Sequence, residues 1–270
     1  MKKRLLYFCS YVPVDILEKA GFEMLNIHEL TFHPKGRRCL PASPCSFIRY
    51  FCDIPYETYD GIIFVNCCNS SQRMYDYVRY HYPNVFSCML ELPAAKDDIW
   101  NYEELIHTLN EYFGCCIRLG KERISPPETY QCFSKEKENL LILSSAVQQE
   151  YVKELKDLFD KFSCHLITCS SEKRGMKYLK GEEVSCPRRL NYFSYIEKKI
   201  KNVSGVIVIL QKNCDPILFA SSVISKMCQE KKISFLLVEE EYAIKISPRS
   251  RLRYEAFLEE LEVGRGKHGK

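Results

Sequence analysis

The stretch Gly205-Val206-Ile207-Val208-Ile209-Leu210-Gln211-Lys212-Asn213-Cys214-Asp215-Pro216 contains the pattern that decides the fold. Its first half, Gly205–Leu210, is a short apolar run rich in β-branched residues, which is typical of a strand buried on both faces. Pro216 then stands where proline is favoured, in the first turn of a helix predicted over Pro216–Glu230. A buried strand followed at once by an amphipathic helix indicates one unit of a parallel α/β sheet.

The same alternation continues along the chain in both directions. Further strands are predicted at Leu5–Cys9, Gly61–Asn66, Val85–Leu90, Leu140–Ser144, His165–Thr168 and Ser234–Val238. Amphipathic helices are predicted at Ser70–Tyr80, Asn101–Phe113, Gln148–Phe162, Tyr192–Lys201 and Ser250–Leu261. We therefore expect an α/β protein with two Rossmann-like domains and mostly parallel sheets.

One segment lacks both helical and strand periodicity. Between Arg118 and Glu138 the chain contains Gly120, the pair Pro126-Pro127 and a charged run, which is typical of a linker. The expected organisation is an N-terminal α/β cofactor-binding domain over 1–117, a linker over 118–138 and a C-terminal α/β domain over 139–263. The Gly- and Lys-rich residues 264–270 are expected to form a disordered tail.

Composition and charge exclude several classes of protein. The chain has 270 residues, 46% of them hydrophobic, which is enough for a substantial core. A formal charge of +4 is too small an excess to predict a nucleic-acid partner. The basic start followed by Leu5–Cys9 resembles a signal peptide, but Pro13 and Asp15 cut the apolar run short, and no later run could span a membrane. We expect a cytoplasmic protein.

Cysteine is the unusual component. The fifteen cysteines form an odd set in a chain too large to need disulfides, so thiols are expected to be available for metal. Several follow predicted strands, at the edge of a parallel sheet where ligands bind: Cys9, Cys67, Cys68, Cys169 and Cys214. Cys88, Cys164 and Cys228 lie within apolar stripes and are expected to be core residues. No compact local metal motif is present, so spacing alone leaves the metal unidentified.

Five blocks of sequence, in order, resemble a known family. They are Tyr7-Phe8-Cys9-Ser10-Tyr11-Val12-Pro13, Pro44-Cys45-Ser46-Phe47-Ile48-Arg49, Tyr59–Asn69, Gly205–Pro216 and Arg251–Glu259. Together they are similar to the D-component family of 2-hydroxyacyl-CoA dehydratases and benzoyl-CoA reductases. The resemblance spans nearly the whole chain.

The resemblance implies a [4Fe–4S] cluster in the cleft between the two domains, held by Cys9, Cys45 and Cys214 with one iron open to solvent or substrate. It further implies a lyase that uses one low-potential electron from an ATP-hydrolysing iron–sulfur activator for the radical dehydration of a 2-hydroxyacyl-CoA. The expected assembly is a homodimer, or a heterodimer with a related subunit. Ser10 and Glu239 are candidate catalytic side chains, although a solvated acidic turn is the plainer interpretation of Glu239 and its two neighbours.

Two departures from the family keep alternatives open. The surplus of cysteines is similar to that of a branch that binds a double-cubane [8Fe–9S] cluster and reduces small molecules; Cys67 or Cys68, Cys169 and Cys186 would be its extra ligands. Only eight residues precede Cys9, whereas typical members carry a helical extension that helps to form the acyl-CoA pocket. A noncatalytic electron-transfer protein is therefore the third alternative. Arg251 and Arg253 open the last predicted helix, where a salt bridge is the expected role.

Overall fold

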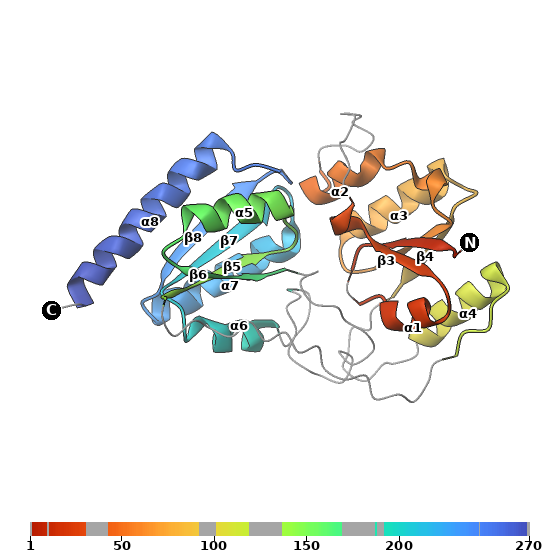
Figure 1. The fold of residues 1–270 in the computed structure, drawn as a ribbon, viewed down its shortest axis with the longest axis horizontal. Helices are drawn as coiled ribbons and strands as arrows, with labels where there is room; N and C mark the ends of the chain where they lie inside the picture. Colours follow the sequence, from red (N-terminus) through yellow and green to blue (C-terminus); the bar gives the residue numbers. More distant parts are fainter. Residues whose placement is uncertain are drawn as a thin grey trace. The chain divides into compact units, whose positions relative to one another are not determined.

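The computed structural model describes residues 2–9, 11–30, 43–91, 101–118, 137–168, 187, 192–242 and 244–268. These residues form two compact units, which are drawn in Figure 1. The first unit contains the described residues up to 44 and those from 48 to 118. The second unit contains the described residues from 137 onward and, in addition, the short segment Cys45–Phe47.

The first unit is built on a four-stranded parallel sheet with the strand order β2-β1-β3-β4. Its strands are β1 (Arg4–Tyr7), β2 (Glu23–Asn26), β3 (Gly61–Val65) and β4 (Phe86–Leu90). The helices that contact this sheet are α1 (Val14–Lys19), α3 (Asn69–His81) and α4 (Asn101–Phe113). In Figure 1, α3 covers one face of the sheet, and α1 and α4 cover the other.

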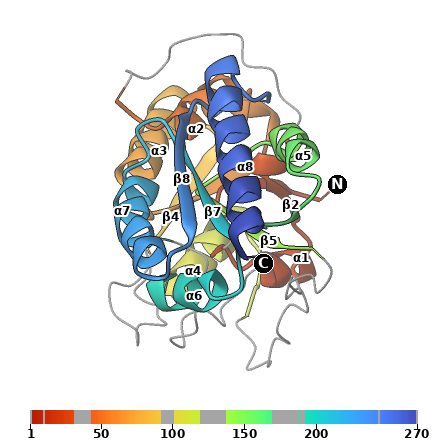
Figure 2. The same ribbon diagram turned by 90° about the vertical axis from the view of Figure 1, so that its left-hand side faces the viewer.

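The second unit repeats this architecture, with the strand order β6-β5-β7-β8 in a four-stranded parallel sheet. Its strands are β5 (Asn139–Ser144), β6 (Ser163–Ile167), β7 (Gly205–Gln211) and β8 (Ser234–Glu240). Its helices are α5 (Gln149–Leu158), α6 (Tyr192–Ile200), α7 (Asp215–Glu230) and α8 (Pro248–His268). Figures 1 and 2 show α5 and α8 over one face of the sheet and α6 and α7 over the other.

The predicted α/β fold with two Rossmann-like domains is therefore confirmed. In each unit the chain starts at an inner strand, moves outward, and then returns to the other side of that strand. The order reverses between β1 and β3 in the first unit and between β5 and β7 in the second. Beyond the carboxyl ends of such strand pairs the loops diverge, and this is where open α/β sheets bind ligands.

The central strands account for the core. Every residue of β3 and of β7 is buried, as expected for parallel strands covered by helices on both faces. Each of these strands begins with a glycine that neighbouring side chains approach closely. A Cβ atom on Gly61 would lie 2.9 Å from the Cβ of Phe86, and one on Gly205 would lie 3.0 Å from Leu261 Cδ2.

Three described elements have no counterpart among the predicted ones: β2, α1 and the short helix α2 (Ser46–Tyr50). The three short 3₁₀ turns Ile27–Glu29, Phe51–Asp53 and Tyr56–Thr58 are also additional. Strand β8 continues to Glu240, and α8 is longer than its predicted counterpart at both ends. Among the described helices, none has the length and apolar character that a membrane-spanning segment requires.

Candidate functional site

Cys214 lies at the carboxyl edge of the second sheet, in the turn between β7 and α7. Its backbone N–H donates to the carbonyl of Gln211 at 2.9 Å, and its own carbonyl accepts from Leu218 N at 3.1 Å. Asn213 adopts a φ of 63° in this turn, a conformation that asparagine tolerates better than most residues. As a result Cys214 becomes the N-cap of α7, with a side chain only 5% exposed.

A buried polar network connects the Cys214 thiol to the ends of β5 and β7. The Cys214 Sγ donates to Ser145 Oγ at 3.2 Å, and Ser145 Oγ donates to Gln211 Oε1. The Gln211 amide in turn donates through Nε2 to Ser144 Oγ at 2.8 Å, and Ser144 donates to the Ile209 carbonyl at 2.9 Å. The side chains of Ser144, Ser145 and Gln211 are all buried, so each depends on these hydrogen bonds.

The segment Cys45–Phe47 belongs to this same edge. Ser46 N donates to the Lys212 carbonyl at 2.9 Å, and Ser46 Oγ accepts from Tyr242 N at 3.0 Å. The Phe47 and Tyr242 rings meet edge to face, with centroids 5.0 Å apart. These contacts place Cys45, which is 5% exposed, in the same unit as Cys214, next to a residue that is bonded to the β7–α7 turn.

Cys9 lies in the first unit, just after β1, with a side chain that is also 5% exposed. Its carbonyl accepts from Val12 N at 3.1 Å in the turn that leads to α1. His28 lies beside this strand, with its Nε2 3.3 Å from the Phe8 carbonyl, and burial lowers the His28 pKa to about 4. The carboxyl end of β1 is thus closely packed around the predicted ligand.

Cys67 and Cys68 follow β3, the strand of the first unit that corresponds to β7. Cys67 N–H donates to the Val65 carbonyl at 2.6 Å in a tight turn. Cys68 is the N-cap of α3, and its Sγ accepts from Ser71 N at 3.4 Å. Cys68 and Cys214 therefore occupy equivalent positions in the two units, because each caps the helix that follows the third strand of its unit.

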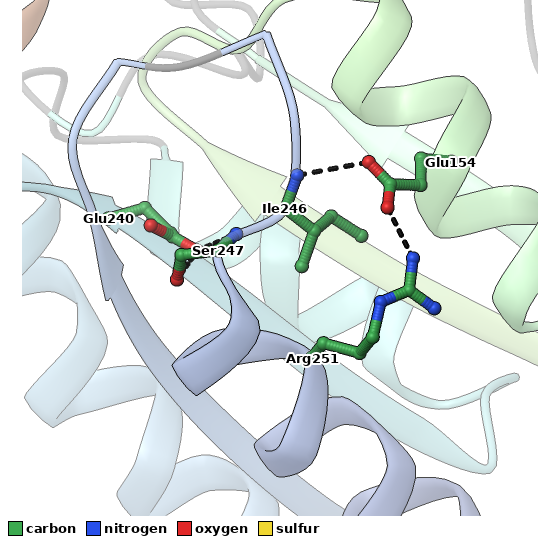
Figure 3. Close-up of polar contacts among 5 residues, drawn as sticks. All are labelled: Glu154, Glu240, Ile246, Ser247 and Arg251. Carbon is green, nitrogen blue, oxygen red and sulfur yellow. Dashed lines mark hydrogen bonds and ion pairs between the residues drawn. The ribbon is translucent and has the colours of Figure 1, made fainter.

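The remaining candidates divide into two groups. Ser10, Cys169 and Cys186 lie outside the described residues. Glu239 is exposed within β8, whereas the next residue, Glu240, is buried and accepts from Ser247 Oγ at 2.9 Å and from Ser247 N at 3.3 Å (Figure 3). The buried carboxylate at the end of β8 therefore holds the start of α8.

The arginine at the start of α8 has a structural role. Arg251 forms an ion pair with Glu154 of α5, and the other oxygen of that carboxylate accepts from Ile246 N at 3.0 Å (Figure 3). These bonds tie the β8–α8 connection to α5. The expectation of a salt bridge at Arg251 agrees with this arrangement.

The three cysteines expected in the core differ from the strand-end cysteines in position. Cys88 and Cys228 are buried, and Cys164 is partly buried. Burial raises the pKa of Cys88 to about 12 and those of Cys164 and Cys228 to about 11. A thiol that resists ionisation is a poor metal ligand and a poor nucleophile, so these positions serve packing.

The donor chemistry at the strand ends suits a soft metal. Thiolates favour zinc and iron–sulfur clusters over magnesium or calcium, and Cys9, Cys45 and Cys214 lie where little water reaches them. The described residues contain no group of three His, Cys, Asp or Glu side chains placed to hold a metal ion. Cys45 and Cys214 belong to the second unit, and Cys9 belongs to the first.

The sequence did not identify Ser145, which contacts the predicted ligand Cys214, or Gln211, which holds Ser145. A signal was present, because polar residues end the apolar runs of β5 and β7.

We found no protein-family model and no curated protein that matches this chain.

Proposed function

We propose that the chain is an iron–sulfur protein of the 2-hydroxyacyl-CoA dehydratase kind, in which Cys9, Cys45 and Cys214 hold a [4Fe–4S] cluster. The observation that carries the proposal is the hydrogen bond from Ser46 N to the Lys212 carbonyl at 2.9 Å. It brings two of the three predicted ligands, which lie far apart in the sequence, to the ligand-binding edge of one sheet.

The surroundings of Cys214 support ligation of an electron-rich metal centre. As the N-cap of the 16-residue helix α7, Cys214 lies at the positive end of a helix dipole, which stabilises a thiolate and the negative charge of a reduced cluster. The cluster, when bound, would supply the one-electron chemistry that removes the hydroxyl group of a 2-hydroxyacyl-CoA. The chain would hold the ligands, exclude water and supply hydrogen bonds to the sulfurs.

Two parts of the proposal concern other molecules, and a third concerns location. An ATP-hydrolysing iron–sulfur activator would deliver the electron, because clusters of this kind need a low-potential donor. A second subunit, identical or related, would complete the assembly. We place the protein in the cytoplasm, where thiols remain reduced.

Anaerobic reconstitution with iron and sulfide, followed by metal analysis, tests the proposal. The wild-type chain should bind about four irons with the absorbance of a cubane cluster. Cys9→Ala, Cys45→Ala and Cys214→Ala should each lose most of that absorbance. The buried core cysteines provide matched controls, so Cys88→Ala and Cys228→Ala should keep it. A colourless, iron-free wild-type protein, or equal losses in all five variants, would contradict the proposal.

A double-cubane reductase is the second candidate, and one observation favours it. Cys68 stands at the N-cap position of α3 and Cys214 at that of α7, so an additional ligand in the first unit would occupy the position equivalent to a proposed one. This candidate predicts about eight irons per chain. It also predicts that Cys68→Ala lowers the iron content more than Cys67→Ala does, so the neighbouring Cys67→Ala variant serves as the control.

An electron carrier without substrate chemistry is the third candidate. Electron paramagnetic resonance of the reduced, reconstituted protein separates it from the enzymes. A spectrum that changes on addition of a 2-hydroxyacyl-CoA supports the dehydratase, because the open iron would then contact the substrate. An unchanged spectrum, with a cluster that still cycles between redox states, supports the carrier.

A further inference from the structure

The polar network beside Cys214 lies at the carboxyl ends of β5 and β7, two strands that are otherwise almost entirely apolar. The first five residues of β5 and the first six of β7 include a single polar side chain, Asn139, at the partly buried start of β5. At the carboxyl ends the character changes, and Ser144, Ser145 and Gln211 are buried together. Burying three polar side chains costs free energy unless their hydrogen bonds are satisfied, so their arrangement requires an explanation.

Ser144 and Gln211 have a sufficient structural explanation, because they bond to one another and Ser144 also bonds to the Ile209 carbonyl. Ser145 is different. Its hydroxyl lies between Gln211 Oε1 and the Cys214 sulfur, 3.2 Å from the latter, and so links the network to the proposed ligand.

We propose that Ser145, held by Gln211, is a positioning residue that hydrogen-bonds the Cys214 sulfur when this sulfur is a metal ligand. The inference rests on the proposed function and deepens it. In the thiol form, Cys214 donates to Ser145, and Ser145 donates to Gln211. Metal ligation removes the thiol proton, so the sulfur becomes an acceptor.

A rotation of the Ser145 hydroxyl then supplies the donor that the sulfur needs. The Gln211 oxygen then loses the Ser145 donor, and it regains one from Ser144, whose Oγ lies 3.2 Å away, when the single Ser144 hydroxyl proton turns to it from the Ile209 carbonyl. Rotation of the Ser145 and Ser144 hydroxyls therefore supplies a donor to the sulfur and to the Gln211 oxygen with no movement of heavy atoms, in exchange for the hydrogen bond from Ser144 to the Ile209 carbonyl. A hydrogen bond to a ligand sulfur stabilises the more negative, reduced cluster and raises its reduction potential.

Redox titration of the reconstituted protein, monitored by electron paramagnetic resonance, tests the role of Ser145. We expect Ser145→Ala to retain its iron and to shift the midpoint potential to a more negative value. Ser145→Thr, which restores a hydroxyl, should return the potential toward that of the wild type. Ser221→Ala removes another buried serine hydroxyl, on α7, that donates to the Leu218 carbonyl of its own helix, and should leave the potential unchanged. If Ser145→Ala does not fold, Ser145→Gly removes the same hydroxyl and serves in its place.

Infrared spectroscopy of the metal-free protein tests the hydrogen bond independently of the cluster. The S–H stretching band of a hydrogen-bonded thiol lies at lower frequency, and we expect one such component to be lost in both Cys214→Ala and Ser145→Ala. Equal potentials in wild type and Ser145→Ala, with equal iron contents, would overturn the inference while leaving the proposed function in place. A wild-type protein that binds no iron would overturn the proposed function, and with it the ligand-positioning role of Ser145.

Discussion

His28 shows how a single partly buried group couples stability to pH. Its ring donates from Nε2 to the Phe8 carbonyl at 3.3 Å, but removal from water dominates and lowers its pKa to about 4. The folded protein therefore holds a neutral imidazole, whereas the unfolded chain has a histidine with an ordinary pKa of about 6.5.

The lowered pKa of His28 predicts a loss of stability in mild acid. The contribution is complete above pH 6.5, and it is lost as the pH falls toward 4, because the unfolded chain binds a proton that the folded one does not. Urea unfolding should show that the wild type loses about 1–2 kcal/mol more than His28→Gln between pH 7 and pH 5. Parallel pH profiles for the two proteins would show that His28 does not titrate as inferred.

The reactivity of a cysteine thiol is predicted to depend on how deeply the residue is buried. Cys116 is exposed after α4, whereas Cys228 is buried within α7 with its pKa raised to about 11, so at pH 8 only about one Cys228 thiol in a thousand is ionised. Brief treatment of the native, metal-free protein with iodoacetamide should modify Cys116 and spare Cys228, as read by peptide mass spectrometry. Urea should equalise the two. Modification of Cys228 at a similar rate in the native protein would contradict the burial seen here.

At the scale of elements, one carboxylate joins α5 to the start of α8 (Figure 3). Glu154 has its pKa lowered, chiefly by the hydrogen bond from Ile246 N and further by Arg251. Its contribution to stability is thus present above the ordinary pKa and is lost as the pH falls through the lowered one. A double-mutant cycle with Glu154→Gln and Arg251→Gln should give a coupling of about 0.5–1 kcal/mol at pH 7, since the pair is partly exposed.

The same cycle at acidic pH provides the control. The coupling should shrink below the lowered pKa of Glu154, because the carboxylate is then neutral. A coupling that is unchanged at low pH would mean that packing of the Arg251 side chain, and not charge, joins the two helices.

Which elements could be predicted depended on burial. The long amphipathic helices have a strong helical periodicity, which predicted α4 over its whole length. The central strands are continuous apolar runs, which predicted β3 and β7 to within one residue. Strand β2 is short, lies at the edge of its sheet and is at most partly buried, so no apolar run marks it. Helix α2 is a short turn whose position depends on contacts with distant residues.

At the scale of the whole molecule, the two units share one strand order, and each carries a cysteine at the N-cap of the helix after its third strand. Each sheet reverses its order beside the strand whose following helix a cysteine caps. The sequence placed these cysteines at strand ends correctly, since a strand end is a local feature. It could not show that Cys45–Phe47 joins the second unit, because that arrangement depends on hydrogen bonds to Lys212 and Tyr242.

The attachment of Cys45 predicts that loss of the Ser46 hydroxyl lowers both the stability of the protein and its iron content. Ser46→Ala leaves the buried Tyr242 N–H without its acceptor, which should cost about 1–3 kcal/mol of unfolding free energy. Because the same hydroxyl holds the segment that carries Cys45, we also expect the reconstituted iron content to fall by at least half. Ser221→Ala is the matched control, since it removes a buried serine hydroxyl from α7. If the two variants bind equal amounts of iron at native conditions, the anchoring of Ser46 is not what brings Cys45 to the cluster.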